Sequence, residues 1–179
     1  MSDYASSVDD ILGQEFLTWL WFKSDVAPDE FCTQKGETFT VSMEQRIVVQ
    51  GGNGDAKETA SVSGVYSPLS EARYGISMGK KVVRALLHFE KDSMNYQFVL
   101  KAEDFTLNSV KIPAVEKSTL QNEDEDALLF EKIFLFENCI EFLDTLYMAF
   151  LKIRLSKEWV EEVHVMRQWV LQKEESTLP

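Results

Sequence analysis

The sequence KKVVRALLHF at residues 80–89, followed by KDSMN at 91–95 and YQFVL at 96–100, decides the fold. The outer two runs are rich in β-branched, leucine and aromatic residues, and the middle run is polar. This pattern predicts a β-hairpin with strands at 80–89 and 96–100 and a connection at 91–95. The apolar–polar alternation of the first run is imperfect, and a helix would fit its valines and leucines nearly as well.

Further strands are predicted on both sides of this hairpin. Before it, residues 39–43 alternate with period two and residues 46–50 form a β-branched run, which together read as a strand pair. The turn-forming residues Gly51–Asp55 lead into a returning strand at 57–64. After the hairpin, residues 104–112 supply one more strand before Pro113. The strands therefore form a small antiparallel sheet.

Four helices are predicted around that sheet. The first begins at Ser6 or Ser7 and stops in 23–25, ahead of Pro28, and a short one begins at Ser67-Pro68 and ends near Gly79. A linker at 113–126, acidic at its end, leads to a long amphipathic helix at 126–154, and Ser156 caps the last helix. We expect one domain over residues 1–179 of the α+β class, with an N-terminal helix, one short inserted helix and two C-terminal helices.

Two helices carry patterns that predict how they pack. The helix at 126–154 has apolar residues at helical spacing, so we expect it to bury Ile133, Phe136, Ile140, Leu143 and Phe150. The first helix has large apolar residues on more than one face, from Ile11 to Trp21. It is therefore packed on two sides, or it presents one face to a partner in a homodimer.

Composition narrows the class of protein. The net charge of -12 argues against a histone-like protein whose whole surface coats nucleic acid. Cys32 and Cys139 are too few and too far apart for a disulfide framework, so free thiols in a reducing cytosol are expected. The first residues lack the pattern of a secretory signal, and no apolar run is long enough for a membrane span. We predict a cytoplasmic protein.

The sequence offers no catalytic or metal-binding constellation. His88 lies within an apolar run and His164 lies between two valines, and neither has the neighbours of a catalytic triad. A zinc site from these histidines with Cys32 and Cys139 would lack the short-range pair of ligands that such sites usually contain. We therefore expect neither an enzyme nor a cofactor.

The segment at 67–101 is net basic within this acidic chain, with six lysine and arginine residues against three aspartate and glutamate residues, and it is called the basic segment below. Its candidate phosphate-binding residues are Arg73, Lys80, Lys81 and Arg84. Together they could form a small positive patch that holds a few phosphates of double-stranded DNA. The alternative is that they are ordinary charges at a helix end and an edge strand, where charge discourages aggregation.

An ordered set of short motifs resembles the second half of the recombination-associated protein RdgC family. The motifs cover roughly Leu12 to Leu151, and they are Glu15–Phe22, Phe39–Glu44, Leu69–Ala72, Gly79–Val83 with the strand after it, Asp104–Ile112 and Asp126–Leu151. Each motif is weak alone, and the resemblance rests on their order and spacing.

The resemblance implies an α+β protein without enzymatic activity. Members of that family bind double-stranded DNA without sequence preference as ring-shaped dimers, associate with the nucleoid and limit strand exchange by the recombinase RecA. The resemblance places the family's basic strand on the one that contains Lys80, Lys81 and Arg84. The expected function is thus DNA binding that modulates recombination, with a recombinase-pathway protein as a further partner. The alternative is an acidic protein-interaction module that keeps the fold without the DNA contact.

Overall fold

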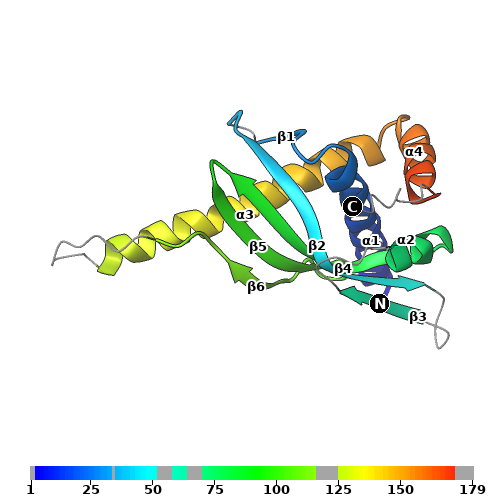
Figure 1. Ribbon diagram of the computed structural model, residues 1–179, viewed down its shortest axis with the longest axis horizontal. Helices are drawn as coiled ribbons and strands as arrows, with labels where there is room; N and C mark the ends of the chain where they lie inside the picture. The colour runs from blue at the N-terminus through cyan, green and yellow to red at the C-terminus, as the bar shows by residue number, and fades with distance from the viewer. Residues whose placement is uncertain (1–2, 34, 52–57, 64–69, 116–124, 172–179) are drawn as a thin grey trace, which may run out of the picture.

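The computed structural model describes residues 3–33, 35–51, 58–63, 70–115 and 125–171. Its elements are α1 (Asp3–Val26), β1 (Phe31–Cys32), β2 (Thr38–Gly51), β3 (Glu58–Ser63), α2 (Ser70–Ser77), β4 (Lys81–Lys91), β5 (Met94–Lys101), β6 (Leu107–Lys111), α3 (Glu125–Arg154) and α4 (Trp159–Leu171). All strand pairs are antiparallel. The predicted α+β class is confirmed, with a helix before the sheet, a short helix inserted within it and two helices after it (Figure 1).

Strands β4 and β5 form the predicted hairpin at the centre of the sheet. Phe89 faces Tyr96 across the ladder, and both side chains are fully buried. Asp92 and Ser93 form the turn with φ of 50° and 66°. Two consecutive residues with positive φ match the twist of the flanking strands, so the connection needs fewer residues than the predicted 91–95.

Strand β2 corrects the prediction of a strand pair at 39–43 and 46–50. The structure has one continuous strand, paired with β4 along its length. Its register shifts between Met43 and Ile47, where β2 carries extra residues relative to β4. The residues between the two apolar runs therefore form an irregularity of the β-bulge type within one strand, and they do not form a turn.

The other edge of β2 is shared by two short strands. β1 pairs with its beginning, where Phe31 faces Phe39, and β3 pairs with its end, where Glu58 faces Gly51. The predicted returning strand is therefore confirmed as β3. The predicted turn lies outside the described residues after Gly51. On the far side the order continues from β4 to β5 and β6, so the last predicted strand is also present.

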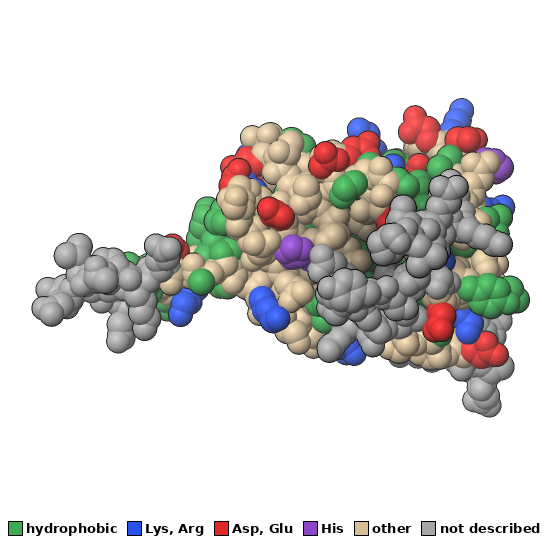
Figure 2. All heavy atoms as spheres, in the orientation of Figure 1, with side chains coloured by type: hydrophobic (Ala, Val, Ile, Leu, Met, Phe, Trp, Pro, Cys, Tyr) green, Lys and Arg blue, Asp and Glu red, His purple; other side chains and the backbone are tan. Residues whose placement is uncertain are grey.

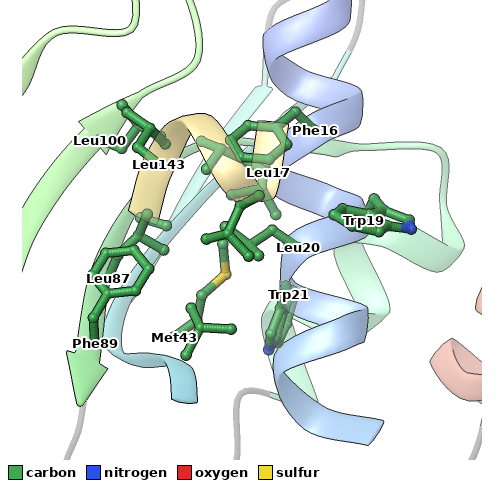
Figure 3. Close-up of a cluster of buried hydrophobic side chains, with 14 of the residues drawn as sticks. Phe16, Leu17, Trp19, Leu20, Trp21, Met43, Leu87, Phe89, Leu100 and Leu143 are labelled. Atoms are coloured by element: carbon green, nitrogen blue, oxygen red, sulfur yellow. The ribbon is translucent and has the colours of Figure 1, made fainter. Parts of the chain in front are cut away.

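Helices α1 and α3 cover one face of the sheet and enclose the core between them (Figures 1 and 3). Phe142 of α3 lies among aromatic rings of the sheet, with its centroid 4.7 Å from that of Phe39 and 5.7 Å from that of Phe89. Such pairs add roughly 0.5–1.5 kcal/mol each beyond the burial of apolar area. The aromatic residues of both helices therefore fix the helices to this face.

Helix α1 is packed on two sides, which settles the alternative left open by its sequence. Residues Phe16 to Phe22 are all buried. On the sheet side, the Thr18 hydroxyl accepts a hydrogen bond of 3.0 Å from the Val82 amide. On the other side, Trp21 packs edge-on against Trp169 of α4. The helix begins at Asp3, before the predicted Ser6 or Ser7, whose side chains lie outside the described part.

The short helices follow the predicted boundaries where the structure describes them. α2 ends at Ser77, two residues before Gly79, whose φ of 88° favours glycine, and the next amide, of Lys80, donates to the Gly75 carbonyl at 3.0 Å. Its predicted start at Ser67 is not among the described residues. Before α4, the Ser156 hydroxyl accepts a hydrogen bond of 3.1 Å from the Glu158 amide.

Helix α3 has the predicted extent but not the predicted burial. Leu143 and Phe150 are buried, whereas Ile133, Phe136 and Ile140 are 44%, 42% and 37% exposed. The helix is roughly 45 Å long at 1.5 Å per residue, and its N-terminal end projects past the sheet (Figure 1). The prediction of burial is therefore wrong for these three residues, which lie on the side of α3 away from the buried Leu135 and Cys139. No helix in the described ranges is both long enough and apolar enough to cross a membrane.

Candidate functional site

Arg73 lies between helices and does not face solvent as a phosphate contact would. Its guanidinium bonds the Asp25 carboxylate and lies 4.6 Å from the centre of the Trp169 ring. The indole nitrogen of Trp169 donates to the same carboxylate at 2.7 Å. Only 12% of the Arg73 side chain is exposed. This predicted DNA-binding residue thus joins α1, α2 and α4.

Lys80 and Lys81 are held by carboxylates. The ammonium of Lys80 lies 3.1 Å from Glu58, and that of Lys81 lies 3.2 Å from Glu15. Glu15 also accepts a hydrogen bond of 2.7 Å from Arg154. Burial raises the pKa of the Glu15 carboxyl, but the hydrogen bond from Arg154 and the charge of Lys81 outweigh burial, and the pKa lies below its ordinary value.

Arg84 is the one exposed member of the predicted set. Its neighbours Ala85 and Leu87 are fully buried, so Arg84 projects from the sheet face that the helices leave open. It stands directly opposite Lys101 of β5. Neither residue forms an ion pair with another described residue. The four candidates therefore do not form one continuous basic face.

A cleft of about 510 Å³ lies between α2, α4 and the start of β4. Ile76, Val163, Met166 and Val170 are among its apolar lining residues, and Lys80, Lys81 and Arg167 are its cations. None of the described lining residues is a histidine, a cysteine or a carboxylate. The described hydroxyl groups of the lining, on Thr18 and Ser77, therefore have no histidine or carboxylate beside them in the cleft.

The histidines and cysteines lie apart, and no group of metal-ligating side chains forms among the described residues. His88 lies on the open face of the sheet, 3.0 Å from Asn95, and His164 lies 3.0 Å from Gln168 on α4. Both cysteines are free, and burial raises the pKa of the Cys139 thiol to about 11. That thiol therefore stays protonated near neutral pH.

The most prominent feature of the described surface is apolar and lies on the first half of α3. On the face shown in Figure 2, apolar side chains gather at the left, beside the projecting end of this helix. Six large apolar side chains of α3 are 37–68% exposed, namely Leu129, Phe130, Ile133, Phe134, Phe136 and Ile140. We call these six residues the α3 apolar surface. Exposed apolar side chains that adjoin in this way usually mark an interaction site, whereas single ones need no explanation.

Sequence reasoning missed this surface because it assigned the apolar stripe of α3 to the core. The signal was present in the run from Leu128 to Phe136, where apolar residues fall on more sides of a helix than one core can cover. The same kind of pattern in α1 is explained by burial on two sides. Only the position of each helix relative to the sheet separates the two cases.

Comparisons of the chain with protein-family models, with curated proteins and with solved structures gave no match. The resemblance to the RdgC family therefore remains a prediction.

Proposed function

We propose that this chain is a non-enzymatic protein-interaction module that binds through the α3 apolar surface. The observation that carries the proposal is the exposure of six large apolar side chains on one half of one helix. Full burial of such a side chain contributes about 1.5–3 kcal/mol relative to full exposure, so covering the 37–68% that remains exposed on each drives association. Their place on a projecting helix gives a partner free access (Figure 1).

The charges around the surface suit a protein partner better than a polyanion. Glu131, Glu137 and Glu141 lie on the same helix, and the net charge of the chain is -12. Three of the four predicted phosphate contacts are already paired with carboxylates. A protein partner would instead gain from an apolar centre with a charged rim, which is the usual composition of an interface.

Photo-cross-linking tests the proposal with a matched control. A photoreactive phenylalanine replaces Phe130 in one variant and Tyr74 in the other, because both aromatic side chains are 68% exposed. In the native cells, we expect discrete adducts from position 130 and none from position 74. Equal adduct formation at the two positions, or none at position 130, would contradict the proposal that the chain binds a partner through the α3 apolar surface.

DNA binding is a second candidate, and one observation favours it. Arg84 and Lys101 face each other on adjacent strands, and like charges at such positions repel unless an anion lies between them. Phosphates of a DNA backbone would supply that anion, in agreement with the RdgC resemblance. A recombinase-pathway protein would then be a further partner.

Duplex binding followed by fluorescence anisotropy over a salt titration tests this candidate. Two phosphate contacts imply a slope of roughly -2 on a log–log plot and weak affinity at physiological salt. Charge reversal at Arg84 and Lys101 should abolish binding, while Lys80→Gln, which removes a cation already paired with the exposed Glu58, should leave it nearly unchanged. Absence of salt-dependent binding by the parent protein would eliminate the candidate.

A further inference from the structure

We propose that the partner of the α3 apolar surface is a second copy of this chain, bound by parallel pairing of the two projecting helices. This inference rests on the proposed function and names its partner. The spacing of Leu129, Ile133, Phe136 and Ile140 is four, three and four residues, which is that of the a and d positions of a coiled coil. We call these four residues the α3 seam.

The residue types of the seam indicate two parallel strands. With Ile133 and Ile140 at the a positions, Leu129 and Phe136 take the d positions. β-branched residues at a with leucine at d favour parallel dimers over larger assemblies, because their side-chain geometries suit the holes of a two-stranded pair. Only Phe136 departs from this preference.

The charges beside the seam are complementary in the parallel arrangement. Lys132 falls at position g, and Glu137 falls five residues later at position e. In a parallel pair, each g residue faces the following e residue of the other helix, so Lys132 of each copy meets Glu137 of the other. In an antiparallel pair, g residues face g residues and e residues face e residues, and this match is lost. Lys132 is exposed and forms no ion pair with another described residue.

The structure also limits the length of the seam. The same stripe continues through Leu143 and Phe150, but these side chains are buried in the chain's own core. About 17 Å of helix, from Leu129 to Ile140, is left for the partner. An interface this short is smaller than that of most stable complexes, so we expect a reversible dimer.

A charge-swap series measured by sedimentation equilibrium tests the partner and its orientation together. Lys132→Glu alone and Glu137→Lys alone should each weaken the dimer about five- to tenfold, because each variant replaces two attractive pairs with repulsive ones. The double variant should restore the parent affinity. Weakening without restoration in the double variant would overturn the parallel arrangement.

A disulfide trap gives a second measurement. In a Cys32→Ser background, Leu129→Cys should form a disulfide-linked dimer under mild oxidation, because identical d positions adjoin in a parallel pair. Met148→Cys, which is on the same helix but off the seam and 60% exposed in the parent, should not. Linkage at both positions or at neither would overturn the inference.

The outcomes separate this inference from the proposed function. If the chain stays at its monomer mass of 20.6 kDa at high concentration and position 130 cross-links to a different protein, the homodimer is wrong. The proposal of an interaction module would still hold in that case. An Ile133→Glu variant controls for the fold, because the side chain is exposed in the monomer. It should keep its circular dichroism and lose the dimer.

Discussion

At the scale of single residues, Glu15 binds two cations that are far apart in the sequence. Its carboxylate joins Lys81 at the start of β4 and Arg154 at the end of α3. The Glu15 side chain is only 18% exposed, whereas its partners are 38% and 32% exposed. Removing the carboxylate would leave both cations without this partner, and their partial exposure limits the cost because water can solvate them.

We expect Glu15→Gln to lower the free energy of unfolding by about 1–3 kcal/mol near neutral pH. Because the folded pKa of Glu15 is below its ordinary value of 4.5, the contribution is complete above 4.5 and is lost as the pH falls through the folded pKa. The difference between parent and variant should therefore shrink on acidification. Urea denaturation over this pH range measures it, with the exposed Glu103→Gln as control. A difference that does not change with pH would contradict the assignment.

Residue identity in the basic segment was visible in the sequence, but the role of each residue was not. The run of Arg73, Lys80 and Lys81 reads as a positive patch because their partners Asp25, Glu58 and Glu15 are remote in sequence. Tertiary packing brings these carboxylates within ion-pair distance. A count of local charge cannot anticipate such pairs, whereas the β4–β5 hairpin followed from local pattern alone.

At the scale of elements, the contact between α1 and the end of β5 is unusually close. A Cβ atom added at Gly13 would lie 1.9 Å from the carbonyl oxygen of Ala102, which is backbone and has little freedom to move. Helix propensity alone would make Gly13→Ala stabilising by about 1 kcal/mol. The close contact with the Ala102 carbonyl makes the same substitution destabilising.

We therefore expect Gly13→Ala to destabilise the fold by about 2 kcal/mol or more, because α1 must shift off the sheet. The matched control is Gly75→Ala in α2, whose added Cβ would meet the side-chain methyl of Val49 at 3.0 Å. That methyl can move, so this variant should stay within about 1 kcal/mol of the parent. Thermal or urea denaturation compares the two, and equal effects would show that the close backbone contact is not rigid.

Helices and strands could be predicted from the sequence where the local pattern of apolar and turn-forming residues determines them. The hairpin and the long helix followed from periodicity and turn residues. The strand pair at 39–43 and 46–50 was wrong because pairing with β4 holds β2 together across its polar middle. That restraint is tertiary, and propensity alone does not contain it.

At the scale of the whole molecule, α3 has two roles divided along its length. Its second half completes the core through Phe142, Leu146 and Phe150. Its first half buries Leu135 and Cys139 on one side and leaves the α3 apolar surface exposed on the other. The sequence shows one uninterrupted apolar pattern across both halves. Leu135, Asn138 and Cys139 lie between Ile133, Phe136 and Ile140 along the helix and are buried, so the exposed three lie on the side of α3 turned away from the sheet. Only the end of the helix projects past the sheet (Figure 1).

This division makes the thermal stability of the chain depend on its concentration. Association through the first half of α3 stabilises the folded state by mass action, and a hundredfold rise in concentration adds up to about 1.4 kcal/mol per chain when the protein is dimeric. For a chain of this length, that corresponds to a rise in the unfolding midpoint of about 2–5 °C. Calorimetry at two such concentrations should show this rise for the parent and none for Ile140→Glu. A midpoint that does not depend on concentration in either protein would mean that the exposed seam does not contribute to the stability of the folded molecule.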